Sequence, residues 1–440
     1  MRRLAWLGLA LVGLTALGAA TYAPDQVGFL PFGRKLVYVL AIIASGLVYA
    51  AAVAIVRNAR IPGGLALALA VAFVLRAITF ATPPLLSTDL FRYVWDGRVQ
   101  AAGINPYLYV PAAPELAFLR DGAVYPNINR AETAPTIYPP AGEALFALIG
   151  MTWSSVRGVK AAMLGFDLIA IGVALGLLRT ARQRLELVLI YAWNPLPVWE
   201  FGGGGHIDAA ATALAGLALL ACAWRRPGWA GAALAAATLT KLLPAALFPA
   251  IWRRGDWRTP LICGAAVAAG YAAYAGAGWR VLGYLPGYAD EEGVGGAGAY
   301  LIRLVAAFSP VPHWVNALYA ALALAALLAL AGWIALRAKL PTDPAARAAT
   351  VCRDAVWLTA ATMVAVSPHY PWYFAGLVLP SVLAPSWSVL WLTIASPVLY
   401  LDDWHDKVIW PSIVFLPFAV LLAFERRGIG SAPALAAKGG

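Results

Sequence analysis

Apolar segments of about 20 residues recur from one end of this chain to the other, and each is long enough to cross a bilayer as a helix. Of the 440 residues, 62% are hydrophobic and only 12% are charged. An ordinary soluble domain carries about twice that charged fraction. Because a spanning segment must satisfy its backbone polar groups internally, these segments are expected to be helical. The sequence therefore predicts an all-α polytopic membrane protein that forms one domain over residues 1–440.

The predicted bundle contains about 11–14 transmembrane or re-entrant helices. Two segments are predicted to be re-entrant. Segment 138–153 is short and begins Tyr-Pro-Pro, and segment 228–251 is interrupted by Thr240-Lys241 and Pro244. The spans are predicted near 4–23, 35–56, 62–82, 159–178, 185–200, 207–224, 260–276, 313–337, 350–367, 371–384, 387–401 and 408–424.

The distribution of charge predicts how the chain lies across the membrane. With a cytoplasmic N-terminus, most Lys and Arg residues fall in cytoplasmic segments and most acidic residues fall on the opposite face. The start of the chain mimics a signal peptide, but an uncleaved first span is favoured because it agrees with this pattern. Residues 83–158 then form a long first extracytoplasmic loop with the re-entrant segment. A loop of this length is more often functional than a simple tether.

Several classes of protein and site are excluded by the sequence. The net charge of +11 comes without a long basic run or an RNA-reading motif, so no nucleic acid partner is expected. The three cysteines lack metal spacing, so neither a disulfide framework nor a metal cluster is expected. No Walker, Rossmann, HExxH or nucleophile-elbow motif is present. A sugar donor would therefore have to arrive already activated and reachable from the membrane.

The stretch STDLFRYVWDGRVQ (87–100) predicts an amphipathic helix within this loop, with its apolar stripe on lipid or protein. Asp89, Arg92 and Asp96 lie on its polar side, and Arg92 is a candidate for substrate binding. A carboxylate at the mouth of a membrane cavity can act as a general base, and Asp89 is the first candidate and Asp96 the second. Asp89 can instead cap the helix. Asp96, four residues after Arg92, can simply pair with it.

Polar residues also cluster in two later segments. In PTIYPPAGE (135–143), Tyr138 belongs to a Pro- and Tyr-rich loop suited to shaping a sugar site, or to an interfacial aromatic belt. In WNPLPVWEFGGGGHIDA (193–209), His206 and Asp208 follow four glycines next to a helix start, which is a natural anion site. Two possible ligands spaced i, i+2 are weak evidence for a metal, and no metal is predicted.

Three further segments supply candidates for substrate binding. Lys241, in TKLLPAALFP, can neutralise a lipid-linked phosphate or can snorkel to the interface. His369 and Tyr370, in SPHYPWYF, can bind a phosphate or sugar, or can fill an aromatic interface. Arg303 is a further cationic candidate on the same face.

These motifs together resemble the GT-C glycosyltransferases that use polyprenyl-phosphate sugars, most closely the bacterial polyprenyl-phosphate-mannose-dependent mannosyltransferases. The resemblance extends from about residue 60 to 400 and implies a GT-C-like bundle in the bacterial inner or plasma membrane. It implies a polyprenyl-phosphate sugar as donor, a glycan or glycolipid as acceptor, membrane lipids as partners and no cofactor. Asp89 would deprotonate the acceptor hydroxyl, with inversion, while Lys241, Arg303 and His369 stabilise the departing phosphate. Mannose, glucose and arabinose remain open as the sugar.

A transporter or flippase of lipid-linked sugars or polyprenyl phosphate is the alternative from another class. Such a protein would also use broken helices and a charge near the membrane midplane, such as Lys241. The long acidic outer loop favours the transferase, because a carrier does not need one.

Overall fold

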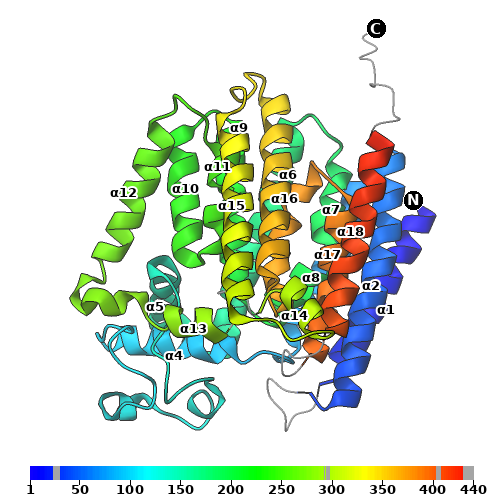
Figure 1. The fold of residues 1–440 in the computed structure, drawn as a ribbon. Coiled ribbons are helices and arrows are strands. Elements are labelled where there is room, and N and C mark those ends of the chain that lie inside the picture. The colour runs from blue at the N-terminus through cyan, green and yellow to red at the C-terminus, as the bar shows by residue number, and fades with distance from the viewer. Residues whose placement is uncertain (23–29, 292, 294–297, 403–407, 430–440) are drawn as a thin grey trace.

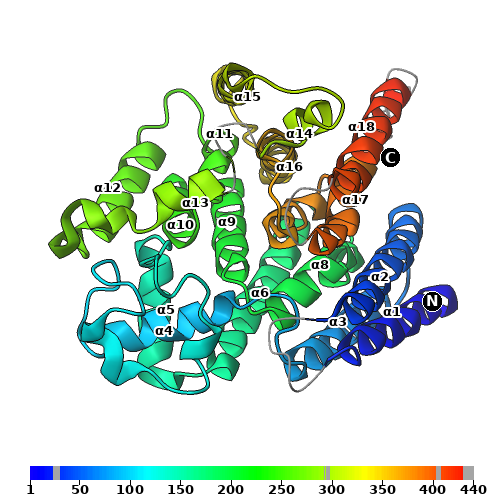
Figure 2. The ribbon, with the colours of Figure 1, turned by 60° about the horizontal axis from the view of Figure 1, so that its bottom comes forward.

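The computed structural model describes residues 1–440 except 23–29, 292, 294–297, 403–407 and 430–440. The described residues form helices and connecting loops with no β-strand, which confirms the predicted all-α polytopic membrane protein. The long helices run side by side as a bundle, with α1 and α2 at one edge and α12 at the opposite edge (Figures 1 and 2).

Among the residues that the structure describes, seven helices are long and apolar enough to span a membrane. Their positions confirm seven of the predicted spans. These helices are α1 (Arg2–Ala19), α2 (Phe32–Asn58), α3 (Gly64–Ala81), α6 (Val156–Thr180), α15 (His313–Leu336), α16 (Pro344–Val366) and α18 (Ile409–Ile429).

Three more predicted spans are shorter or bent helices. Helix α12 (Arg258–Ala272) turns by 108° into the next segment, which contains η6 (Ala275–Leu282) and α13 (Leu285–Glu291). Helix α9 (Asp208–Ala223) is apolar but has only 16 residues. Helix α17 (Trp387–Ala395) continues as the 3₁₀ turn η9 (Ser396–Leu401).

Segments 185–200 and 371–384 are not continuous helices, so their prediction as single spans was wrong. The first consists of η3 (Leu185–Val188), α7 (Leu189–Ala192), α8 (Pro195–Pro197) and the π-helical turn η4 (Val198–Gly203). The second consists of the 3₁₀ turns η7 (Pro371–Leu377) and η8 (Pro380–Val382). Prolines interrupt both segments, and each proline removes a backbone N–H that a continuous helix needs. Both segments are buried within the bundle, where neighbouring helices shield their irregular backbone.

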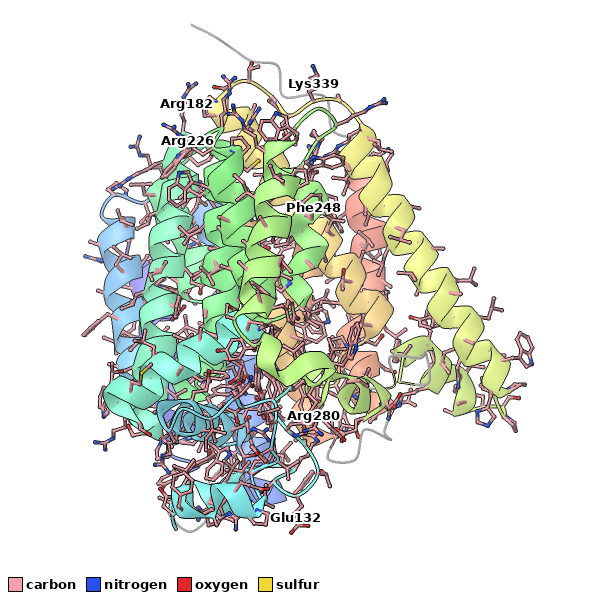
Figure 3. All side chains as sticks on the ribbon, turned by 90° about the vertical axis from the view of Figure 1, so that its left-hand side faces the viewer. Glu132, Arg182, Arg226, Phe248, Arg280 and Lys339 are labelled. Carbon is pink, nitrogen blue, oxygen red and sulfur yellow. The ribbon has the colours of Figure 1, made fainter. Side chains whose placement is uncertain are left out.

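Segment 228–251 forms a hairpin, as its charge pattern predicts. Helix α10 (Pro227–Thr240) ends before Lys241, because Pro244 has no N–H to donate to the Thr240 carbonyl. The chain then turns through η5 (Leu243–Leu247) and α11 (Phe248–Ile251) back to Arg253. Arg253 shares Asp354 with Arg337, so the chain returns to the same end of the bundle that holds Arg226 and Lys339 (Figure 3).

The two ends of the bundle differ in the residues they carry. Arg182, Arg226 and Lys339 lie at one end, while Glu132 and Arg280 lie at the other (Figure 3). We call these the basic end and the loop end. The separation agrees with the predicted division between the two faces of the membrane.

The loop end is covered by α4 (Asp89–Ala101) and α5 (Pro140–Trp153), with α4 lying across the bundle (Figure 1). The 3₁₀ turns η1 (Pro114–Leu119) and η2 (Tyr125–Asn127) lie between them in sequence, and α14 (Tyr300–Ala306) follows α13. Helix α4 is buried on nearly every side, so its apolar stripe packs on protein. It approaches α5 very closely, because a Cβ on Gly97 would lie 2.3 Å from the Phe146 carbonyl oxygen.

Candidate active site

A cavity of about 590 Å³ opens beside the start of α4 at the loop end. Its walls come from segments far apart in sequence: α4, the loop before α5, the turn of the 228–251 hairpin, α13 and the segment around η7. Of the residues predicted to form the site, Asp89, Arg92, Tyr138, Lys241 and Tyr370 line this one cavity. A concave site with several converging polar groups is typical of a substrate pocket.

Asp89 occupies the first turn of α4 and is half-buried at the cavity wall. Its backbone N–H donates to the Ser87 hydroxyl, and its carboxylate accepts a hydrogen bond from Asn129 Nδ2 at 3.1 Å. The residue at the cap position is Thr88, and no side chain caps the helix. The positive end of the helix dipole stabilises a carboxylate here. Asn129 therefore positions the Asp89 carboxylate through Oδ1 at the wall of the cavity.

Asp96 lies about two turns further along α4 and does not line the cavity. It is 2% exposed and pairs with Arg92, whose Nε lies 2.9 Å from Asp96 Oδ1. Arg92 also donates to the Ala134 carbonyl at 3.0 Å. The pairing expected from the i, i+4 spacing is therefore present. The catalytic role of Asp96 stays a prediction, and its position behind the wall favours a supporting role.

Glu143 of α5 is a buried acid that the sequence analysis did not single out. It is fully buried, hydrogen-bonds with Asp96, and accepts hydrogen bonds from Thr136 at 2.5 Å and Gln100 at 2.8 Å. Burial, and then the nearby charge of Asp96, raise the pKa of Glu143 well above its usual range. The raised pKa favours the neutral form of the Glu143 carboxyl group beside Asp96. Arg92, Asp96 and Glu143 form a buried cluster behind the part of the cavity wall that residues 134–138 provide. Arg92 binds Ala134 and Glu143 binds Thr136 in that part of the wall.

Replacing Glu143 by Gln is expected to make the stability of the protein less dependent on pH. Because its pKa is raised, neutral Glu143 stabilises the fold fully below its unfolded value of about 4.3, and this contribution is lost as pH rises toward the folded pKa. Gln keeps a neutral donor toward Asp96. Unfolding temperatures should be measured in detergent from pH 4 to 8. The unfolding temperature of the variant should increase relative to that of wild type as the pH rises. The exposed Glu115→Gln is the control, and parallel curves for wild type and Glu143→Gln would contradict the raised pKa of Glu143.

Lys241 reaches the cavity from the turn of the hairpin. Its Nζ donates to both oxygens of Asp208 at 2.7 and 2.8 Å, and it lies 4.3 Å from the centre of the Tyr373 ring. Asp208 is the first residue of α9, so two predicted binding residues form one ion pair. The lysine is thus a fixed cation at the inner wall of the cavity.

A narrow apolar slot of about 60 Å³ continues from Lys241 into the bundle. Lys241, Leu243, Met363 and Tyr373 line both the cavity and this slot. The rest of the slot is formed mainly by Ala, Gly, Leu and Pro residues of α9, η5 and the segment 376–380, with Thr359 and Thr362 from α16. The larger cavity, which holds the carboxylate of Asp89, therefore joins a narrower apolar slot at the position of the lysine.

His206 lies behind the cavity rather than in its lining. Its ring stacks on Trp372 with centroids 4.3 Å apart, and Tyr370 stacks on Trp372 at 4.4 Å. Nδ1 lies 3.0 Å from a Glu200 oxygen, and Tyr400 donates to both oxygens of Glu200. The buried imidazole thus supports an aromatic wall formed by Trp372 and Tyr370.

Arg303 and His369 line a separate small pocket next to the cavity. His369 Nε2 lies 3.4 Å from the Gly298 carbonyl oxygen, and Arg303 lies 3.9 Å from Asp402. The structure therefore does not bring these two residues to Asp89. Their contact with a substrate stays a prediction.

The cavity also contains residues that the sequence analysis missed. Asn129 binds Asp89, and Arg130 pairs with Glu291 at 2.5 Å across the cavity mouth. Tyr284 and Tyr288 of the α13 region complete the rim. Asn129, Arg130 and Tyr284 lie in irregular loops and Tyr288 lies in the short helix α13, and none of these positions carried a spacing signal. Glu143 carried a different signal that could have been used, because a charge within an apolar segment is usually functional. Within the described part of the chain, no group of three His, Cys, Asp or Glu side chains is placed to hold a metal ion.

Comparison with known proteins identifies a family. The model of glycosyltransferase family 87 matches residues 136–368, which is more than half of the chain. The match includes Tyr138, His206, Asp208, Lys241 and Arg303, whereas Asp89 precedes it and His369 follows it. No curated protein and no solved structure matches the chain.

Proposed function

The chain belongs to glycosyltransferase family 87, and from this premise we propose its donor, acceptor and mechanism. The protein is a membrane glycosyltransferase. The proposed reaction transfers a hexose, with mannose as the first candidate, from a polyprenyl-phosphate donor to a hydroxyl of a glycan or glycolipid. It takes place on the extracytoplasmic face of the cell membrane. The observation that carries the proposal is the lining of one cavity by both Asp89 and Lys241, next to an apolar slot.

The donor is proposed to lie across the junction of cavity and slot. Its polyprenyl chain would enter the apolar slot between α9 and α16, and its phosphate would lie at Lys241. An ammonium fixed by Asp208 and shielded by Tyr373 is a preorganised charge for an anionic leaving group. The sugar would then project into the larger cavity, toward Asp89.

The chemical step is a direct displacement at the anomeric carbon. The acceptor hydroxyl gives its proton to the Asp89 carboxylate as its oxygen attacks that carbon. The new glycosidic bond forms while the bond to the phosphate oxygen breaks, and polyprenyl phosphate leaves with the electron pair. A single displacement inverts the configuration. Asn129 positions the base, and no cofactor is needed because the donor is already activated.

The aromatic walls suit the binding of sugars. Tyr138, Tyr284, Tyr288, Tyr370, Trp372 and Tyr373 line the cavity. Aromatic rings offer apolar faces to the C–H surface of a pyranose, while the tyrosine hydroxyls offer hydrogen bonds. The stack of His206, Trp372 and Tyr370 keeps part of this wall rigid.

The purified protein incubated with polyprenyl-phosphate mannose and a glycan acceptor tests the proposal. Free polyprenyl phosphate should appear in equal amount to a new inverted glycoside, as measured by mass spectrometry. Glucose and arabinose donors test the choice of sugar. Transfer only from sugar nucleotides would overturn the proposed donor. Movement of the sugar lipid across vesicles without any new glycoside would instead favour the transporter alternative.

Replacing Lys241 by Met is expected to lower the turnover rate by about 10²–10³-fold, the usual cost of one stabilising group. The loss should appear mainly in kcat, because charge on the leaving phosphate grows as the bond breaks. Lys339→Gln, at the exposed basic end, is the matched control and should leave turnover unchanged. Near wild-type turnover of the Met variant would show that Lys241 has only a structural role, through its ion pair with Asp208.

A further inference from the structure

A second cavity, of about 480 Å³, lies at the basic end of the molecule, opposite the candidate active site. It is bounded by the end of α2, the segment 181–190 after α6, the first turns of α16 and residues 382–385. Arg182, at the edge of this region, is seen at the basic end in Figure 3. We call this cavity the basic-end groove. The glycosyltransferase reaction as proposed does not use it.

The lining of the groove contains two chemically different sets of residues, which we call its two walls. One wall is apolar and contains Leu187, Ile190, Val382, Leu383 and Pro385. The other contains Arg57, Gln183 and Arg184, together with Ala345 and Ala346 of the first turn of α16. A site for a small anion needs only the second wall. The apolar wall beside it indicates a ligand with both a charged and an apolar part.

The two arginines of the groove are held in different ways. Arg184 donates to the carbonyls of Val56 and Arg57 at 2.6 and 3.1 Å, so it is fixed against the end of α2. Arg57 is exposed, and its guanidinium lies 5.2 Å from the centre of the Trp387 ring. Arg184 thus supplies a rigid charge, and Arg57 keeps its donors available to a ligand.

The charge balance of the groove is positive. None of the described residues that line it is acidic. The nearest acids are already shared with arginines, since Asp343 lies 3.5 Å from Arg182 and Glu186 lies 3.6 Å from Arg184. Asp343 also caps α16 through the Ala346 N–H at 2.9 Å. Glu186 therefore partly neutralises Arg184, whereas no ion pair among the described residues involves Arg57, so the lining keeps a net positive charge.

The groove lies at the depth of lipid head groups, because the spans α2 and α6 end there and α16 begins there. We propose that the basic-end groove binds a phospholipid with a net negative head group. Its phosphate lies at Arg57 and Arg184, and one acyl chain lies along Ile190, Val382 and Leu383. Anionic lipids are attracted to clustered arginines at a membrane surface, and the apolar wall adds the selection for a lipid over a free anion.

Delipidated full-length protein in a neutral detergent allows a direct test. Phosphatidylglycerol should raise the unfolding temperature saturably. Phosphatidylcholine with the same acyl chains, and inorganic phosphate, should produce no saturable rise. Arg57→Gln should require about fivefold more phosphatidylglycerol for half of the effect, which corresponds to one arginine at a membrane surface. Arg226→Gln, exposed at the same end but outside the groove, is the matched control.

A second variant tests the apolar wall separately. Ala349→Leu narrows the groove and should weaken the response to phosphatidylglycerol while leaving the unfolding temperature without lipid unchanged. An equal response of wild type and Arg57→Gln would overturn the proposal. An equal effect of inorganic phosphate would show a small-anion site, and an equal effect of phosphatidylcholine would show general solvation by lipid. Each of these outcomes can be read without any activity assay.

Discussion

Asp89→Asn is expected to lower the rate of sugar transfer by about 10²–10⁴-fold, because it removes the group that takes the acceptor proton. Asparagine has nearly the same shape and can still accept the hydrogen bond from Asn129. The change should therefore reduce kcat while leaving donor affinity and the unfolding temperature close to those of wild type. Single-turnover transfer from a labelled lipid-phosphate sugar measures the effect.

Two comparisons make this experiment decisive. Glu132→Gln removes an exposed carboxylate from the same loop end and should leave transfer unchanged. Asp96→Asn should lower the unfolding temperature as well, because it leaves buried Arg92 without its carboxylate partner. Near wild-type transfer by Asp89→Asn, with transfer abolished in a well-folded Asp96→Asn protein, would show that Asp96 is the base.

Asp167→Asn is expected to destabilise the protein by about 3–5 kcal/mol, the usual cost of breaking a buried ion pair by removing one partner. Asp167 of α6 is fully buried and lies 2.6 Å from Arg76 Nε of α3. Tyr191 donates to the same carboxylate at 2.7 Å, and Arg76 donates to the Ala192 carbonyl at 2.7 Å. The substitution leaves a buried cation without its counter-charge, and neither residue of the pair lines the candidate active site.

Reversible unfolding in detergent or lipid discs measures this change. Leu168→Ala is the matched control, because Leu168 is the next residue of α6 and its side chain is 52% exposed. The double variant Arg76→Leu/Asp167→Leu should be more stable than either single variant, since it removes both buried charges. Equal stability of Asp167→Asn and wild type would mean that the pair contributes little to holding α3 against α6.

The sequence predicted the long spans well, because about 20 apolar residues have few stable alternatives to a helix in a membrane. It also predicted the hairpin around Lys241 from the arginines at both ends and Pro244. It failed at 185–200 and 371–384, where hydropathy was high but prolines broke the helix. Hydropathy reports burial, and a buried irregular segment inside a bundle has the same hydropathy as a span.

The candidate site was predicted in part. Asp89, Lys241, Tyr138 and Tyr370 were chosen separately and line one cavity. Arg303 and His369 were chosen for the same reasons and line a different pocket. Arg76 and Asp167 were visible as charges within predicted spans, yet their pairing joins different helices and could not be predicted from spacing.

The sequence by itself determined the class of the protein, the division of charge between its two ends and the residue types able to carry its chemistry. Hydropathy, charge and short motifs are local properties, so they can be read from the chain directly. The tertiary structure alone decided that Asp89 faces the cavity while Asp96 is buried with Glu143, and that Lys241 meets Asp208 at the head of an apolar slot. These relations depend on how distant helices pack, and no local pattern contains that information.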